Sequence, residues 1–286
     1  MCDDDIHPGL TVDSRLSRRG FGLAAMAAAG AATAARAAVP VVEADVTIKT
    51  PDGTADAALF HPEGRGAWPA VLVWPDVVSL RPVFREMGRR LAGEGYVVLV
   101  PNLYYRVRKA PVGGPTFSFA NPADRAILSP LRATVTPERT ARDAVAYLAY
   151  LDGLPQTDRG KKAGVQGYCM GGPMAFQSAA ATAPRIGAVA SFHGGGLATN
   201  APNSPHRLLK YSPAEYLVLV AENDDLRAPQ EKETVRTALA AAGRPHKVEV
   251  YPAAHGWTVR GSAVYEEAEA ERAWAELLAL YRRALV

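Results

Sequence analysis

The segment Gly167-Tyr168-Cys169-Met170-Gly171-Gly172 decides the fold that this sequence predicts. It follows a short apolar run, 163–165, that is typical of a strand, and it precedes 173–177, whose pattern indicates a helix. A strand, a nucleophile between glycines and a helix together form a nucleophile elbow. The turn is so tight that side chains two positions before and after the nucleophile would clash, which explains the glycines.

Cys169 is the candidate nucleophile of this elbow. The strained turn is expected to lift its thiol above the sheet and to place the N-terminus of the next helix beneath it. The positive end of the helix dipole favours a thiolate and an oxyanion alike. The alternative is structural, because a small buried cysteine is common in protein interiors.

Length and composition favour one globular domain of α/β type. The chain has 286 residues, enough to bury a full core, and its 48% hydrophobic and 21% charged residues are ordinary values. The net charge of +3 is too small to indicate binding to nucleic acid or to an anionic membrane. We therefore expect a small-molecule substrate rather than a polymeric anion.

The N-terminus resembles a twin-arginine export signal. Arg18 and Arg19 precede an alanine-rich stretch and an Ala-x-Ala site at 35–37. We expect residues 1–37 to be recognised by the twin-arginine machinery and removed, leaving a periplasmic or secreted domain of residues 38–286. A surface helix is the alternative; a stable membrane span is disfavoured because the stretch is short and contains glycines.

Cleavage would also remove Cys2 and leave Cys169 as the one cysteine of the mature protein. No intramolecular disulfide could then form. A free thiol in an oxidising compartment is a liability, so its retention indicates use.

Strand-like and helix-like segments alternate along the rest of the chain, which predicts a mainly parallel, doubly wound sheet flanked by helices, the α/β-hydrolase arrangement. The expected strands are 41–48, 57–60, 69–75, 96–101, 163–165, 186–192, 216–221 and 247–251. From 107 to 137 the periodicity fades and prolines and glycines are dense. We interpret that stretch as a cover over the site, with a plain surface excursion as the alternative.

Three reactive residue types follow three of the predicted strands. Cys169 comes first, then Asp224 or Asp225, then His255, and this is the order of nucleophile, acid and base in α/β hydrolases. His255 would take the thiol proton and return it to the leaving group, and the carboxylate would orient the imidazole. Counting forward from the end of the strand 216–221 favours Asp224 as the acid, whereas counting back from Pro229 favours Asp225.

Two backbone amides are expected to form the oxyanion hole. One is that of Met170, directly after the nucleophile, and the other is that of Val77, in the turn after the strand 69–75.

The cysteine elbow, the stretch 101–106, the Glu-Asn-Asp-Asp at 222–225 and the His-Gly-Trp at 255–257 resemble the dienelactone hydrolase family. The similarity runs from about residue 41 to the end and includes the final helix, with Glu266-Glu267-Ala268 and Glu271-Arg272-Ala273-Trp274. It implies an α/β hydrolase that cleaves an enol-lactone or ester through a thioacyl intermediate. It implies no metal or organic cofactor.

The resemblance also assigns positions to substrate and nucleophile contacts. Asp76 stands where the family has a glutamate that contacts the resting cysteine, and Arg260 lies one residue from the family's carboxylate-binding arginine. A second such arginine would be Arg106, Arg125 or Arg132. The remaining candidate substrate contacts are Tyr104, His193 and Trp257. For His193, a structural hydrogen bond to a loop is the favoured alternative.

Two other functions fit the same residues. One is a broader carboxylesterase or thioesterase with a different pocket. The other is a binding or thiol-sensing protein that keeps a reactive Cys169 without turnover.

Overall fold

The computed structural model describes residues 39–114, 117–119 and 121–286. The predicted export signal, residues 1–37, lies outside the described residues. Among the described helices, none is long and apolar enough to cross a lipid bilayer.

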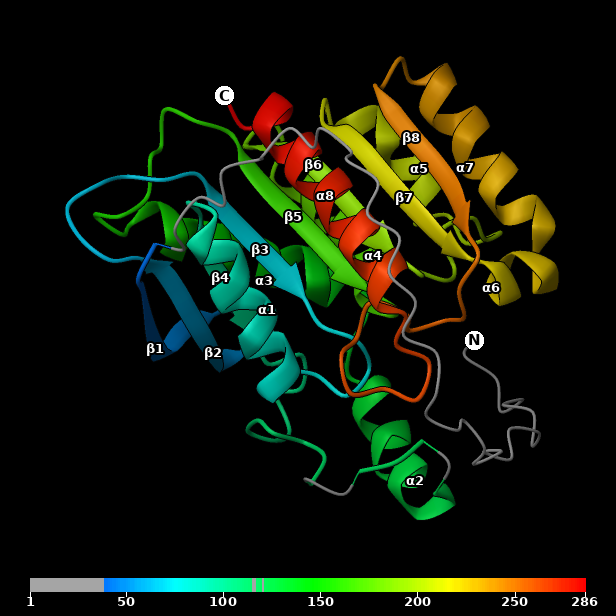
Figure 1. Cartoon of the computed structure of the whole chain (residues 1–286), viewed down its shortest axis with the longest axis horizontal. Helices are drawn as coiled ribbons and strands as arrows, with labels where there is room; N and C mark the ends of the chain where they lie inside the picture. The colour runs from blue at the N-terminus through cyan, green and yellow to red at the C-terminus, as the bar shows by residue number, and fades with distance from the viewer. Residues whose placement is uncertain (1–38, 115–116, 120) are drawn as a thin grey trace, which may run out of the picture.

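The described residues are built on an eight-stranded sheet with the order β1-β2-β4-β3-β5-β6-β7-β8 (Figure 1). Neighbouring strands are parallel from β4 to β8, whereas β2 pairs antiparallel with both β1 and β4. The strands are β1 Val41–Thr50, β2 Gly53–Pro62, β3 Ala70–Trp74, β4 Val97–Pro101, β5 Ala163–Tyr168, β6 Ile186–Phe192, β7 Glu215–Ala221 and β8 His246–Tyr251. The predicted α/β-hydrolase fold is confirmed.

Helices cover both faces of the sheet, because the central strands are apolar on both sides. Every residue of β3, β4 and β5 is buried. One face carries α1 (Pro82–Gly93) and α8 (Glu267–Ala284), which lie in front of the sheet in Figure 1. The other face carries α3 (Pro137–Asp152), α4 (Gly171–Ala181) and α7 (Pro229–Ala241). The sheet thus separates two hydrophobic cores.

The stretch 107–137, expected to be irregular, contains the helix α2 (Pro122–Arg132). Pro130 interrupts its sequence pattern, yet Leu128 and Leu131 are buried against the core. The side chain of Asn121 caps the helix by accepting a hydrogen bond from the amide of Ala123. In Figure 1, α2 lies below the sheet, on the side where the parallel strands end.

Short helices follow β6 and β7 in the chain. They are α5 (Pro205–Leu208), the 3₁₀ helix Leu209–Tyr211 and α6 (Glu222–Arg227), which begins directly after β7. Residues 222–225 are therefore the first turn of α6, and this turn sets the directions of the two candidate acids.

Candidate active site

The turn after β5 has the geometry expected of a nucleophile elbow. Cys169 adopts a left-handed backbone conformation with φ of 53°. A Cβ on Gly167 would lie 1.9 Å from the carbonyl oxygen of Gly171, and one on Gly171 would lie 2.4 Å from that of Trp74. Both glycines are therefore required by close backbone approach, as the sequence predicted.

Cys169 stands at the beginning of α4. The preceding strand ends at Tyr168, Met170 is the N-cap residue, and the amide of Gly172 donates to the carbonyl of Cys169 at 3.0 Å. The first amides of a helix have no partner within the helix, and they carry its positive dipole end. The thiol therefore lies where a negative charge is stabilised.

The histidine and one of the two candidate acids are in direct contact. The Nδ1 atom of His255 is 2.6 Å from Oδ2 of Asp224. The amide of His255 also donates to the side chain of Asn223 at 2.8 Å. Asp225 instead forms an ion pair with Lys232 at 2.5 Å. The structure thus joins Asp224, and not Asp225, to the histidine.

Cys169, Met170 and Asp224 line one cavity of about 370 Å³ at the edge where the parallel strands end. The glycine loop 194–196 and Val218 form part of its wall, and Arg132, Arg227 and Lys232 also line it. The carboxyl edge is where open α/β sheets build their sites.

Two arginines that line this cavity have no ion-pair partner among the residues that the structure describes. Within the described ranges, the guanidinium groups of Arg132 and Arg227 form no hydrogen bond or ion pair. Arg132, at the end of α2, is one of the three candidate arginines for a substrate carboxylate. Arg227 was missed, and the signal available was its place at the end of the helix that carries Asp224.

The other candidate arginines lie elsewhere. Arg106 is held between Asp143 and Asp52, at 2.7 Å from each, and does not line the Cys169 cavity. Arg125 donates to the carbonyl of Phe119. Arg260 lines a different cavity, on the opposite face of the sheet.

Asp76 has its own ion-pair partner. The guanidinium of Arg81 contacts both of its carboxylate oxygens, at 2.6 and 2.7 Å, and the amide of Val78 donates to Oδ1 at 2.9 Å. These bonds hold the turn after β3, which contains Val77.

Tyr104 also stabilises the turn after β3. Its hydroxyl donates to the carbonyl of Val77 at 2.6 Å, and its side chain is fully buried. Burial, and next the negative charge of Asp76, raise the pKa of Tyr104 far above its ordinary value. Tyr104 therefore stays neutral and donates, and it fixes the peptide between Val77 and Val78.

His193 and Trp257, both expected as substrate contacts, are buried behind His255. The ring of His193 meets that of His255 edge-on at 4.8 Å, and its Nε2 atom is 3.0 Å from the hydroxyl of Thr258. Burial, and secondly the nearby His255, hold the pKa of His193 well below its usual value. Trp257 packs against His193 and stacks on Tyr251. Neither residue lines the Cys169 cavity.

Left-handed backbone conformations gather at this edge. Among the described residues, the non-glycine positions with positive φ are Ser79, Cys169 and His193, which follow β3, β5 and β6. Such conformations cost about 1–3 kcal/mol each and cluster at functional sites.

The fold and the ordered Cys, Asp and His at strand ends define an α/β hydrolase. Residues 55–285 match the model of the dienelactone hydrolase family, and the chain belongs to that family. The family comprises hydrolases of the carboxymethylenebutenolidase type, so the protein is an ester or lactone hydrolase.

Two relatives show how far the similarity extends along the chain. A Synechocystis protein named "Putative carboxymethylenebutenolidase" is 27% identical over 231 residues, which are 79% of this chain and 91% of that protein. The carboxymethylenebutenolidase of Pseudomonas sp. strain P51 is 34% identical over 119 residues, which are 41% of this chain and 46% of that protein.

Solved structures share the fold. The Klebsiella pneumoniae protein named "Putative Dienelactone Hydrolase" aligns with a TM-score of 0.74 and 23% identity, covering 85% of this chain and 99% of that one. The dienelactone hydrolase of Anabaena variabilis aligns with a TM-score of 0.61 and 20% identity, covering 86% of this chain and 99% of that one.

Proposed function

We propose that the protein cleaves an enol-lactone or carboxylic ester through a thioacyl intermediate on Cys169. The observation that carries this proposal is the 2.6 Å contact between Asp224 and His255, made at the strand edge where Cys169 and Asp224 share a cavity. Asp224 fixes the tautomer with Nδ1 protonated, which leaves Nε2 of His255 as the base.

In the first step, the Sγ atom of Cys169 forms a bond to the acyl carbon. His255 takes the thiol proton and gives it to the alkoxide or enolate oxygen as the carbon–oxygen bond breaks. Water then attacks the thioester and loses a proton to His255, which passes it to the departing thiolate. The product is a carboxylic acid, and the thiol is restored.

The amides of Met170 and Val77 are proposed to hold the oxyanion. Met170 supports this role by its place at the N-terminus of α4. The turn containing Val77 is fixed on two sides, because Tyr104 bonds to its carbonyl and Asp76 accepts from the next amide. Rigid donors of this kind need no reorganisation as charge develops.

We further propose that the substrate carries a carboxylate. Arg132 and Arg227 line the Cys169 cavity without an anionic partner among the described residues. An arginine fork binds a carboxylate with two parallel hydrogen bonds. A cavity of about 370 Å³ lies in the lower part of the range of small-molecule sites.

Rapid-mix mass spectrometry with an activated aryl ester tests the covalent step. A transient acyl adduct on Cys169 that clears, and that is missing in His255→Ala, is the expected result. An adduct that never clears would favour the thiol-sensing function instead. Complete absence of an adduct on the wild-type protein, with the thiol shown to be free by alkylation, would contradict the mechanism.

A broader carboxylesterase or thioesterase is the second candidate. It is favoured by the placement of Arg106 and Arg260 outside the Cys169 cavity. Comparing kcat/KM for monoaryl succinates with kcat/KM for their neutral methyl esters distinguishes the two candidate functions. Equal kcat/KM values for the two substrates would favour the broad enzyme.

We also propose export by the twin-arginine route, on the Arg18-Arg19 pair and the Ala-x-Ala site. Cell fractionation of the native chain and of the Arg18→Lys, Arg19→Lys double variant tests this proposal. The native protein should be found outside the cytoplasm at reduced length. Equal cytoplasmic retention of both chains would contradict export.

A further inference from the structure

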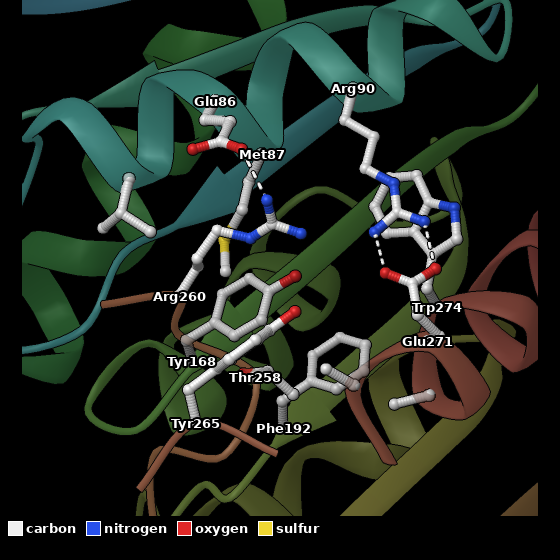
Figure 2. Close-up of a pocket in the computed structure, with 13 residues that line it drawn as sticks. Glu86, Met87, Arg90, Tyr168, Phe192, Thr258, Arg260, Tyr265, Glu271 and Trp274 are labelled. Carbon is white, nitrogen blue, oxygen red and sulfur yellow. Dashed lines mark hydrogen bonds and ion pairs between the residues drawn. The ribbon is translucent and has the colours of Figure 1, made fainter. Parts of the chain in front are cut away.

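A second cavity, of about 290 Å³, lies between α1 and α8 on the face opposite the Cys169 cavity (Figure 2). The two cavities share no lining residue. Tyr168 and Phe192 form its floor, and their rings are stacked at 4.8 Å with an interplanar angle of 11°. Met87, Tyr265 and Trp274 extend the apolar lining.

Two ion pairs on α1 border this α1–α8 cavity, and they differ in strength. Arg90 contacts both oxygens of Glu271, at 2.7 and 2.5 Å, and its guanidinium lies 4.2 Å from the centre of the Trp274 ring. This arginine is fixed by its carboxylate and by the aromatic face together.

Arg260 has a weaker carboxylate contact than Arg90, and its guanidinium also lies 5.7 Å from the centre of the Tyr265 ring. Its guanidinium is 3.7 Å from Glu86, beyond hydrogen-bond distance, and both side chains are more than half exposed. Figure 2 shows it directed toward Glu86 above the tyrosine rings. An exposed pair at this distance contributes about 1 kcal/mol or less, so an anion within the cavity can compete for Arg260.

We propose that the α1–α8 cavity binds a planar aromatic monocarboxylate, with its ring against Tyr168 and Phe192 and its carboxylate on Arg260. Flat aromatic side chains favour a flat aromatic guest, through offset stacking and edge contacts. Because Arg90 remains paired with Glu271, Arg260 is left to bind the ligand. Its single positive charge matches a ligand with a single carboxylate. The volume, at the lower limit of small-molecule sites, suits a ligand of one or two rings.

The α1–α8 cavity is lined by residues that are direct neighbours, in sequence, of residues at the carboxyl edge of the sheet. Tyr168 directly precedes Cys169, and Phe192 directly precedes His193. Thr258 lines the cavity and bonds to the ring of His193, which in turn packs on His255. The proposal concerns binding and does not rest on the proposed hydrolysis.

Calorimetric titration of the full chain carrying Cys169→Ala tests the proposal without turnover. The probes are 2-naphthoate, the neutral 2-naphthamide and the non-planar cyclohexanecarboxylate. We expect 2-naphthoate to bind more tightly than either of the others. Absence of measurable 2-naphthoate binding, or equal binding of the naphthamide, would overturn the proposal.

Four variants locate the site. Arg260→Gln should weaken 2-naphthoate binding about fivefold, and Ala270→Phe should abolish it by filling the cavity. Arg159→Gln on the surface is the matched control and should leave it unchanged. Loss of binding in Arg132→Gln with none in Arg260→Gln would overturn the proposal by placing the acid beside Cys169. Circular dichroism verifies the fold of Ala270→Phe, and Arg260→Gln decides the matter alone if that fold is lost.

Discussion

The two cavities lie on opposite faces of one sheet, yet they differ in how their charges are arranged. The Cys169 cavity contains a strained nucleophile and two arginines without a partner among the described residues. The α1–α8 cavity is aromatic, and its two arginines face carboxylates. Unpaired charge beside a nucleophile suits chemistry on a charged substrate, whereas paired charge around an aromatic floor suits reversible binding.

Neighbouring residues contribute to different cavities because side chains alternate along a strand and its extension. Tyr168 faces the α1–α8 cavity and Cys169 the other. Sequence proximity to the nucleophile therefore does not identify which cavity a residue serves.

The largest expected effect is on turnover at the nucleophile. Cys169→Ala should lower kcat by at least about a thousandfold, because the variant has no thiol to form the thioacyl intermediate. Steady-state hydrolysis of an aryl ester measures the loss, and an unchanged thermal midpoint shows that the fold is intact. Hydrolysis at the wild-type rate by the purified variant would show that Cys169 is not the nucleophile. The Cys169 cavity would then no longer be distinguished from the α1–α8 cavity by its chemistry.

The next largest effect should be a difference in kcat between variants of the two adjacent aspartates. Asp224→Asn should lower kcat by about a hundredfold or more, because the amide no longer stabilises the imidazolium of His255. Asp225→Asn is the matched control, and losing its ion pair with Lys232 should change kcat less than about threefold. Equal losses in both variants would reject Asp224 as the acid.

His193, which packs between Thr258 and His255, should make stability depend on pH. Its pKa is lowered in the native protein, so the unfolded chain binds the proton more readily. The contribution of His193 to stability should therefore be fully present above the ordinary pKa of about 6.5 and should decrease as the pH falls below it.

Urea unfolding near pH 7.5 and near pH 5 measures this contribution, with His193→Gln as the control that cannot titrate. The free energy of unfolding of the wild type should decrease more than that of the variant between the two conditions. The same loss in both proteins would show that His193 is protonated in the folded state.

The smallest expected effect concerns substrate affinity. Arg132→Gln should raise KM for a monoaryl succinate about tenfold and leave the neutral methyl ester unaffected, because only the former carries a carboxylate. Arg260→Gln should leave both KM values within about twofold, since Arg260 lines the other cavity. An effect of Arg260→Gln equal to that of Arg132→Gln would mean that one site spans both faces.

The places of the strands along the chain and the elbow could be predicted because local sequence marks them. Buried parallel strands are continuous apolar runs, and Gly167 is required by a backbone contact within the turn, whereas the contact that requires Gly171 is with Trp74 of β3. The helix α2 escaped prediction because Pro130 breaks its periodicity and because packing of Leu128 and Leu131 on the core stabilises it.

Side-chain partners were harder to predict than positions. The choice between Asp224 and Asp225 depends on the first turn of α6, and Lys232 of α7 takes the second carboxylate. The pair of Asp76 and Arg81 joins residues five apart through a turn that no periodicity describes. Arg106 has two carboxylate partners brought together by tertiary packing alone.

The strand order places β1 and β8 at the two ends of the sheet, and this has a consequence for solubility. On β1, Glu43 and Asp45 form ion pairs with Arg85 of α1. On β8, Lys247 and Glu249 pair with each other and with residues of α8. Charged side chains on an edge strand oppose the addition of a strand from another molecule. Both ends of the sheet are thus protected against edge-to-edge aggregation at high protein concentration.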